Sequence, residues 1–248
     1  AAGFHAVPHL SARMVRDRAH LRALLARMAD AGLSHAFVVG GDGPAPGSFP
    51  DGLSLLRGIA DAGVALTSIG IPCYPDGHAF IPPERLVAAL REKSAFASYM
   101  TTQLCFRPAT IETWVRARRA EGMALPVVIG VPGVTEPHRL LAISARIGVG
   151  DSSRFLRKNA GLVARLIRSG GFYRPDGLLR GLVPLLADPA ANVRGLHLYT
   201  FNQIAATVAW RAALLARLRP GVAVVTTERW VPAGQGAGWL TPGEPRGT

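Results

Sequence analysis

Side chains that can form hydrogen bonds or transfer protons are concentrated in residues 197–203, which read His-Leu-Tyr-Thr-Phe-Asn-Gln. This polar cluster follows an apolar segment that begins at Val193, and it precedes an amphipathic helical pattern. In a parallel α/β protein, binding and catalytic side chains gather at the carboxyl ends of the strands. We therefore expect one site assembled from strand ends. The other predicted strand ends are at residues 9–11, 40–42, 74–78, 101–103 and 129–133.

The residue types at two of these ends suit the binding of a small molecule. Gly41 follows a strand and permits a ligand to approach the backbone closely. Asp42 adds a carboxylate, although an ordinary turn with Asp42 as a local cap fits the same residues. Tyr74 and His78 project from one proline-containing turn, and a loop histidine without a ligand is the alternative interpretation.

A third strand end contains Gln103, whose amide can both donate and accept hydrogen bonds along the edge of a ring. The dipeptide Thr-Gln at 102–103 is a weak signal by itself.

Short apolar runs alternate with segments of helical period, and the strand ends lie roughly 30 residues apart, which is typical of βαβ units. Six such units are present. A closed (β/α)8 barrel needs eight units, whereas an open doubly wound sheet needs five or six, so periodicity alone leaves both architectures open. Residues 136–190 predict several helices and no strand. The other predicted strands are 36–39, 64–71, 99–106, 127–131 and 193–199, and the helices are 16–30, 53–62, 109–120, 202–218 and one from residue 83.

The composition excludes several classes of protein. A net charge of +12 suggests nucleic-acid binding, but only two of the 28 basic residues are lysines, and no basic run is interleaved with aromatic residues. We therefore expect no nucleic-acid partner. No apolar run is long enough to cross a membrane, so we expect no membrane association. Two cysteines, Cys73 and Cys105, are too few for a disulfide framework or a cysteine-based zinc site.

Taken together and in this order, the six strand ends resemble the methylenetetrahydrofolate reductase family of flavin-dependent TIM barrels. The resemblance covers about residues 5–210. The matching motifs are Pro-His-Leu at 8–10, Gly-Asp at 41–42, Tyr-Pro-x-x-His at 74–78, Thr-Gln at 102–103 and the cluster at 197–203.

The resemblance implies a (β/α)8 barrel fold, of which this chain holds about six βα units, the third to the eighth. They would form one domain over residues 1–220, and residues 221–248, rich in Gly and Pro, would form a poorly ordered extension. The implied activity uses FAD and NAD(P)H to reduce 5,10-methylenetetrahydrofolate to 5-methyltetrahydrofolate. We expect a cytoplasmic homo-oligomer.

The resemblance also implies roles for individual residues. Asp42 would be the catalytic carboxylate that tunes the flavin and holds the pterin ring of the folate. Cofactor contacts are implied for His9, Gly41, Asp42, Tyr74, His78 and Lys93, with the lysine near the flavin phosphate. Folate contacts are implied for Gln103, Tyr199 and Gln203. No metal site is implied.

Two positions depart from the family pattern. Gly40 replaces an arginine, which removes a contact to the phosphate or ribityl group of the flavin. Gln203 also replaces an arginine, which weakens charge pairing with the carboxylates of folate. The basic stretch at 150–158 either supplies that charge or forms a solvated helix face.

The family's general-acid glutamate lies at the end of the first barrel strand, and its place would fall before Ala1, as would the first two βα units. General-acid catalysis contributes about 10²–10⁴-fold. We therefore expect residues 1–248 alone to bind flavin weakly and to turn over little substrate.

Two other classes of protein fit some of these residues. A metal-dependent TIM-barrel hydrolase would use His9, Asp42, His78 and His197, but neither a His-x-His pair nor a cluster of carboxylates accompanies them. A non-catalytic barrel remnant is the other alternative. Retained yellow flavin colour would favour the reductase, and bound zinc would favour the hydrolase. The absence of both would favour the remnant.

Overall fold

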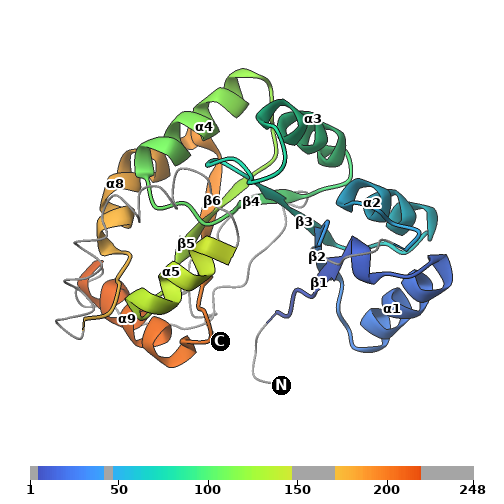
Figure 1. Cartoon of the computed structure of the whole chain (residues 1–248), viewed down its shortest axis with the longest axis horizontal. Helices are drawn as coiled ribbons and strands as arrows, with labels where there is room; N and C mark the ends of the chain where they lie inside the picture. Colours follow the sequence, from blue (N-terminus) through green and yellow to red (C-terminus); the bar gives the residue numbers. More distant parts are fainter. Residues whose placement is uncertain (1–4, 42–46, 147–170, 219–248) are drawn as a thin grey trace, which may run out of the picture.

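The protein is built around one parallel sheet of six strands (Figure 1). The computed structural model describes residues 5–41, 47–146 and 171–218. Within these residues the strands pair in chain order, and each is parallel to its neighbour. The strands are β1 (His9–Ser11), β2 (His35–Val39), β3 (Ser68–Cys73), β4 (Tyr99–Thr102), β5 (Val127–Pro132) and β6 (Val193–Tyr199).

This strand order decides between the two architectures that periodicity left open. A doubly wound sheet reverses its strand order at a switch point, whereas the order here runs from β1 to β6 without a reversal. Because parallel crossovers are right-handed, an unreversed order places the connecting helices on one face of the sheet. The described strands therefore form a sector of a (β/α)8 barrel, as the sequence predicted.

The helices follow one another around the outside of this sector (Figure 1). Most of the predicted helices are present, with bounds that differ by one or two residues. They are α1 (Arg18–Asp30), α2 (Gly52–Asp61), α3 (Pro83–Ser94), α4 (Pro108–Ala120), α5 (Pro137–Arg146), α8 (Asp176–Leu186) and α9 (Ile204–Leu218). No described helix is long and apolar enough to cross a membrane.

Two predicted strands were too long. The strand predicted at 64–71 begins only at Ser68, because residues 64–67 connect α2 to the sheet and Val64 is 37% exposed. The strand predicted at 99–106 ends at Thr102, although Leu104 and Phe106 are buried. These two side chains pack with Leu140 in a small separate cluster, so their apolar character reflects burial in a loop.

Some predicted features lie outside the described residues. They are the extension at 221–248, the basic stretch at 150–158 and Asp42. The boundary between the domain at 1–220 and the extension therefore stays a prediction.

Local sequence explains where the helices begin. The side chain of Asp17 accepts a hydrogen bond from the backbone N–H of His20, which caps α1. Asp51 and Ser54 form a capping box at the start of α2. In α3 and α4, proline occupies the first turn, where no backbone N–H is needed.

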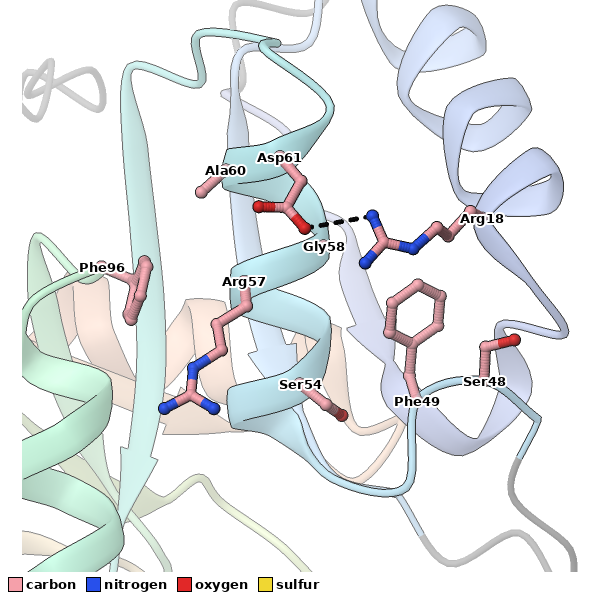
Figure 2. A pocket seen from close by; sticks show the side chains of 9 residues that line it. All are labelled: Arg18, Ser48, Phe49, Ser54, Arg57, Gly58, Ala60, Asp61 and Phe96. Carbon is pink, nitrogen blue, oxygen red and sulfur yellow. Dashed lines mark hydrogen bonds and ion pairs between the residues drawn. The ribbon is translucent and has the colours of Figure 1, made fainter.

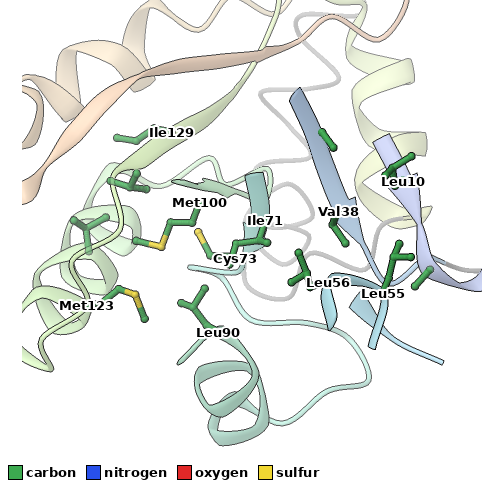
Figure 3. Close-up of a cluster of buried hydrophobic side chains, with 14 of the residues drawn as sticks. Leu10, Val38, Leu55, Leu56, Ile71, Cys73, Leu90, Met100, Met123 and Ile129 are labelled. Atoms are coloured by element: carbon green, nitrogen blue, oxygen red, sulfur yellow. The ribbon is translucent and has the colours of Figure 1, made fainter. Parts of the chain in front are cut away.

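The main core lies between the sheet and the outer helices (Figure 3). Alternate strand residues face it, since successive side chains of a strand point to opposite faces. Leu10, Val38, Ile71, Met100 and Ile129 are among the buried contributions of the first five strands.

The opposite, inner face of the sheet carries aromatic and histidine side chains instead. His9 pairs with Phe37 in the β1–β2 register, and their ring centroids lie 4.8 Å apart. Phe37 lies 6.2 Å from the ring of Tyr99. Gly70 lies between these two rings, and a Cβ there would lie 2.3 Å from the Tyr99 ring. Glycine at 70 therefore lets the two rings cover the inner face of β3.

Helix α3 is packed less tightly than its neighbours. Its one buried residue is Leu90, whereas α2 buries Leu55, Leu56 and Ile59 together with two glycines. A helix that buries so little of its surface gains little hydrophobic stabilisation. Because α3 packs loosely, a space remains between this helix and the sheet.

The core assignment predicts the effect of a truncation in β3. Ile71 is fully buried, so Ile71→Ala is expected to lower the free energy of unfolding by about 2–5 kcal/mol. Ile204→Ala, at a side chain that is 59% exposed, serves as the control with an effect below about 0.5 kcal/mol. Equal losses for the two variants in urea denaturation would contradict the assignment.

Candidate functional site

A cavity of about 730 Å³ lies where the ends of β2 and β3 meet the inner side of α3. Gly40 and Tyr74 line it from the strand ends, and Leu90 and Lys93 line it from α3. Cavities of about 300–1,000 Å³ are typical of sites for small molecules and cofactors. The cavity therefore occupies the place at which the sequence predicted a site.

The turn after β3 brings Tyr74 and His78 together. The backbone N–H of Gly77 donates to the Tyr74 carbonyl over 3.2 Å, and Gly77 has a φ of 78°. The two rings meet edge to face with their centroids 5.4 Å apart. Tyr74 lines the cavity directly, whereas His78 contacts the Tyr74 ring and is not among the cavity-lining residues.

Gly41 is required by the close approach of two strand ends. Its φ is 85°, and a Cβ at this position would lie 1.9 Å from the Ser11 hydroxyl oxygen. Only glycine fits both conditions. Asp42, the next residue, lies outside the described part of the chain.

Lys93 places a largely buried amine beside the cavity. Burial lowers the pKa of Lys93, and this effect exceeds the opposing influence of Cys73 and Asp51. No carboxylate of the described residues lies within ion-pair distance of this amine. A buried cation without a paired anion is costly, and an anionic ligand would offset that cost.

The ends of β4, β5 and β6 are joined by hydrogen bonds. The Tyr199 hydroxyl donates to the Thr102 carbonyl over 3.0 Å, and the Thr102 hydroxyl accepts from the backbone N–H of Gly130 over 2.8 Å. Gly130 lies under the Tyr199 ring, because a Cβ there would lie 2.6 Å from that ring. Burial raises the pKa of Tyr199, with smaller contributions from Cys73 and Tyr74. The Tyr199 ring is thus held in one orientation as a neutral phenol.

Gln103 follows β4 and is partly fixed by the backbone. Its backbone N–H donates to the Cys73 carbonyl over 2.7 Å, and its side-chain oxygen accepts from the N–H of Leu104 over 2.9 Å. The side-chain NH₂ group remains as a donor for a ligand.

The segment after β6 has an unusual backbone. Phe201 and Asn202 have φ values of 49° and 63°, a region that residues other than glycine rarely adopt. Gln203 then closes the turn with a hydrogen bond from its N–H to the Thr200 carbonyl. Such conformations are enriched at functional sites, and this turn follows directly from Tyr199.

His9 and His197 lie on the inner face of the two outermost described strands. Burial lowers the pKa of both imidazoles, and the proximity of His9 lowers the pKa of His197 further. The His197 ring also meets Tyr199 edge to face, with centroids 4.6 Å apart. The two histidines therefore face the same interior space from β1 and β6.

The predicted residues fall into three groups. Tyr74 and Lys93 line the cavity, with Gly41 and His78 immediately beside it. Gln103 lies directly after β4 and Tyr199 at the end of β6, and the Tyr199 hydroxyl donates to the carbonyl of Thr102. His9 and Gln203 are not among the cavity-lining residues; His9 lies on the inner face and Gln203 in the turn after β6.

The sequence predicted no role for three residues at this site. Thr102 and Gly130 fix the Tyr199 ring, and Trp114 lines the far end of the cavity from α4. The sequence signal for Gly130 was a lone glycine inside an apolar strand, a pattern that indicates close approach of another group. Trp114 has no comparable signal, because an aromatic residue in a helix usually packs in the core.

A second cavity, of about 410 Å³, lies around the exposed side of α2 (Figure 2). Arg18 and Arg57 lie on opposite sides of the helix there, and Arg18 donates to Asp61 over 3.0 Å. Arg57 lies 3.7 Å from Glu92. Both cations are paired, and Glu92, the partner of Arg57, also lines the first cavity. Among the residues described, no group of three His, Cys, Asp or Glu side chains is placed to hold a metal ion.

A comparison with protein-family models matches residues 1–149 to methylenetetrahydrofolate reductase. The matched part includes β1 to β5 and every predicted site residue from His9 to Gln103. The chain belongs to the methylenetetrahydrofolate reductase family. Tyr199 and Gln203 lie beyond the matched residues, and the hydrogen bond from Tyr199 to Thr102 connects Tyr199 to the matched part.

Membership of the methylenetetrahydrofolate reductase family supports a folate-related oxidoreductase at the level of the family. The sector of a (β/α)8 barrel agrees with this assignment, because the site lies at the carboxyl ends of the strands, as it does in barrel enzymes.

A substitution at Gly130 tests whether this residue packs closely against the Tyr199 ring and the Thr102 carbonyl. Gly130→Ala is expected to lower the free energy of unfolding by about 1–3 kcal/mol, because the added Cβ would lie 2.2 Å from the Thr102 carbonyl oxygen. Gly195→Ala on β6 is the matched control, since no atom lies within 4 Å of the added Cβ. Indistinguishable denaturation midpoints for the two variants would show that the close packing is absent.

Lys93 gives a second test, through the pH dependence of stability. Its lowered pKa means that the unfolded chain binds more protons at alkaline pH, so stability rises with pH in that range. At neutral pH the buried charge lowers stability, and Lys93→Met is expected to be more stable than the parent.

This advantage should shrink as pH rises through the lowered pKa toward the ordinary value of 10.5. Arg57→Met, at a side chain that is 61% exposed, controls for loss of a surface cation. A Lys93→Met protein that is less stable at neutral pH would contradict the burial of an uncompensated charge.

Proposed function

We propose that this protein reduces 5,10-methylenetetrahydrofolate to 5-methyltetrahydrofolate, with FAD as cofactor and NAD(P)H as electron donor, in cytoplasmic one-carbon metabolism. The observation that carries the proposal is the cavity at the strand ends, which joins Tyr74 and Lys93 in a chain of the methylenetetrahydrofolate reductase family. Its volume of about 730 Å³ is within the range for a bound cofactor.

The residues around the cavity fit a flavin nucleotide. Gly40 and Gly41 leave the backbone accessible, Tyr74 offers a ring beside the strand ends, and Lys93 offers a cation for a phosphate. When bound, FAD would supply the hydride-transfer chemistry. The chain's own part is to orient the cofactor and to exclude water from its buried side. Asp42, as the residue after Gly41, would place a carboxylate near the ring.

Folate would bind on the side formed by β4 and β6. Gln103 offers a side-chain NH₂ group toward a pterin, since its oxygen is already bound to Leu104. The Tyr199 ring offers an apolar face, because its hydroxyl is bound to Thr102. Gln203, in the turn that follows β6, would contact the outer part of the substrate.

Anaerobic stopped-flow mixing tests the function directly. The full-length protein, loaded with FAD, is mixed first with NADH or NADPH and then with methylenetetrahydrofolate, and the absorbance of the flavin is followed. Bleaching followed by recovery of absorbance is expected. A protein that reduces no flavin and turns over no folate would refute the proposal.

A substitution at Gln103 separates the two half-reactions. Gln103→Glu replaces the donor NH₂ group with a charged oxygen, so folate reduction is expected to slow by about tenfold or more. Flavin reduction by NAD(P)H is expected to stay within about twofold, because Gln103 lies at the next strand end and does not line the cavity. Equal slowing of both half-reactions in stopped-flow traces would show that Gln103 does not act on folate.

A further inference from the structure

We propose that Asp176 is a positioning residue for the turn at 200–203 on the folate side of the site. Its carboxylate holds α9 through Trp210, and α9 in turn holds this turn, which carries Gln203. The inference rests on the proposed function and assigns a role to two residues, Asp176 and Trp210, that no sequence motif singled out.

The turn after β6 has a conformation that needs support from both sides. Phe201 and Asn202 both have positive φ values, 49° and 63°. Residues other than glycine keep such conformations only where the surrounding structure fixes them. On one side the turn is fixed by β6, which pairs with β5 up to Tyr199. On the other side it leads directly into α9, so the placement of α9 is the second support.

Few buried side chains hold α9 in place. Of its 15 described residues, only Thr207 and Trp210 are buried, whereas Ile204 and Val208 are each 59% exposed. Thr207 packs against the segment after β5, since a Cβ at Gly133 would lie 2.6 Å from the Thr207 hydroxyl oxygen. That oxygen has no hydrogen-bond partner among the described residues. Trp210 is therefore the buried side chain of α9 that is held by a hydrogen bond.

Trp210 is anchored by Asp176, the first residue of α8. The indole Nε1–H donates to one oxygen of the Asp176 carboxylate over 3.1 Å. Arg217, near the end of α9, donates to the other oxygen, also over 3.1 Å. Arg174 adds a third hydrogen bond at 3.2 Å. A single carboxylate thus receives donors from the middle and from the end of α9.

Helix α8 is a firm support for this carboxylate. It packs against α4, and its buried residues are Leu178, Leu182 and Leu185. A carboxylate in the first turn of a helix is also favoured by the helix dipole. Burial opposes the ionisation of Asp176, but the three hydrogen bonds outweigh this effect and lower its pKa. Asp176 is therefore a charged and well-fixed acceptor at neutral pH.

The path from Asp176 to the turn is short. Trp210 lies about one helical turn after Thr207, and the Thr207 backbone N–H donates to the Gln203 carbonyl over 3.1 Å. The Gln203 N–H in turn donates to the Thr200 carbonyl over 2.7 Å. A displacement of α9 would therefore shift Gln203 and remove one of the two supports of the turn.

Removal of one partner at a time tests this role in the full-length protein. Asp176→Ala removes the acceptor, and Trp210→Phe removes the donor but keeps an aromatic ring. Each is expected to raise the dissociation constant of 5-methyltetrahydrofolate, measured by isothermal titration, by about three- to thirtyfold. Flavin reduction by NAD(P)H is expected to stay within about twofold, because α9 does not line the cavity. The double variant should bind folate no more weakly than Asp176→Ala, since both changes remove the same hydrogen bond.

Hydrogen exchange of backbone amides gives a second readout that needs no ligand. The amides of residues 200–207 are expected to exchange faster in both variants, and those of β3 are expected to be unchanged. Asp176→Asn keeps an acceptor oxygen and should lie between the parent and Asp176→Ala in both measurements. Asp188→Ala is the matched control, because this carboxylate accepts from Arg116 and from the backbone of Ala190. It should change neither measurement.

Unchanged folate affinity in Asp176→Ala and Trp210→Phe would overturn the proposal while the proposed function stands. So would equal losses of folate binding and of flavin reduction, or an equal effect of Asp188→Ala. Weaker folate binding without faster exchange at 200–207 would also overturn it, since the effect would then not pass through α9. If exchange in the turn depends on Asp176 but the parent neither binds nor reduces folate, the proposed function fails and Asp176 keeps its role in positioning the turn.

Discussion

Hydrogen bonding between parallel strands in chain order is the constraint on which this structure depends. Each right-handed crossover brings the chain back to begin the next strand parallel to the previous one. The carboxyl ends of all the strands therefore lie at the same end of the sheet. Residues that are far apart in sequence, such as Thr102 and Tyr199, become hydrogen-bonded neighbours for this reason. The outer helices bury the alternate apolar side chains, and the inner face keeps its histidines and aromatic rings.

The loosely packed helix α3 combines low stability with a capacity to bind. A helix that buries only Leu90, together with a largely buried Lys93 and an unsatisfied Nε of Arg118, gives up stabilising interactions in the ligand-free chain. Proteins accept such local costs where binding requires them. All three features lie around one cavity. An anionic ligand beneath α3 would offset the cost of burying the cations of Lys93 and Arg118.

The fold and part of the site follow from the sequence for identifiable reasons. Regular alternation of strands and helices predicted β6 with its observed bounds, and the Tyr-Pro-x-x-His motif predicted that Tyr74 and His78 share one turn. Strand ends were less predictable, because buried loop residues such as Leu104 are as apolar as strand residues. The contribution of Trp114 to the cavity was not predictable, since it depends on how α3 and α4 pack and not on any local pattern.

Hydrogen exchange of backbone amides, measured with and without saturating FAD, tests the central claim that a cofactor fills the space beneath α3. The amides of α3 are expected to exchange readily without ligand and to slow markedly with FAD, together with those of residues 74–78. The amides of α1, which does not line the cavity, should change little. Exchange in α3 that is unaffected by FAD, or slowing confined to the second cavity around Arg18 and Arg57, would contradict the account.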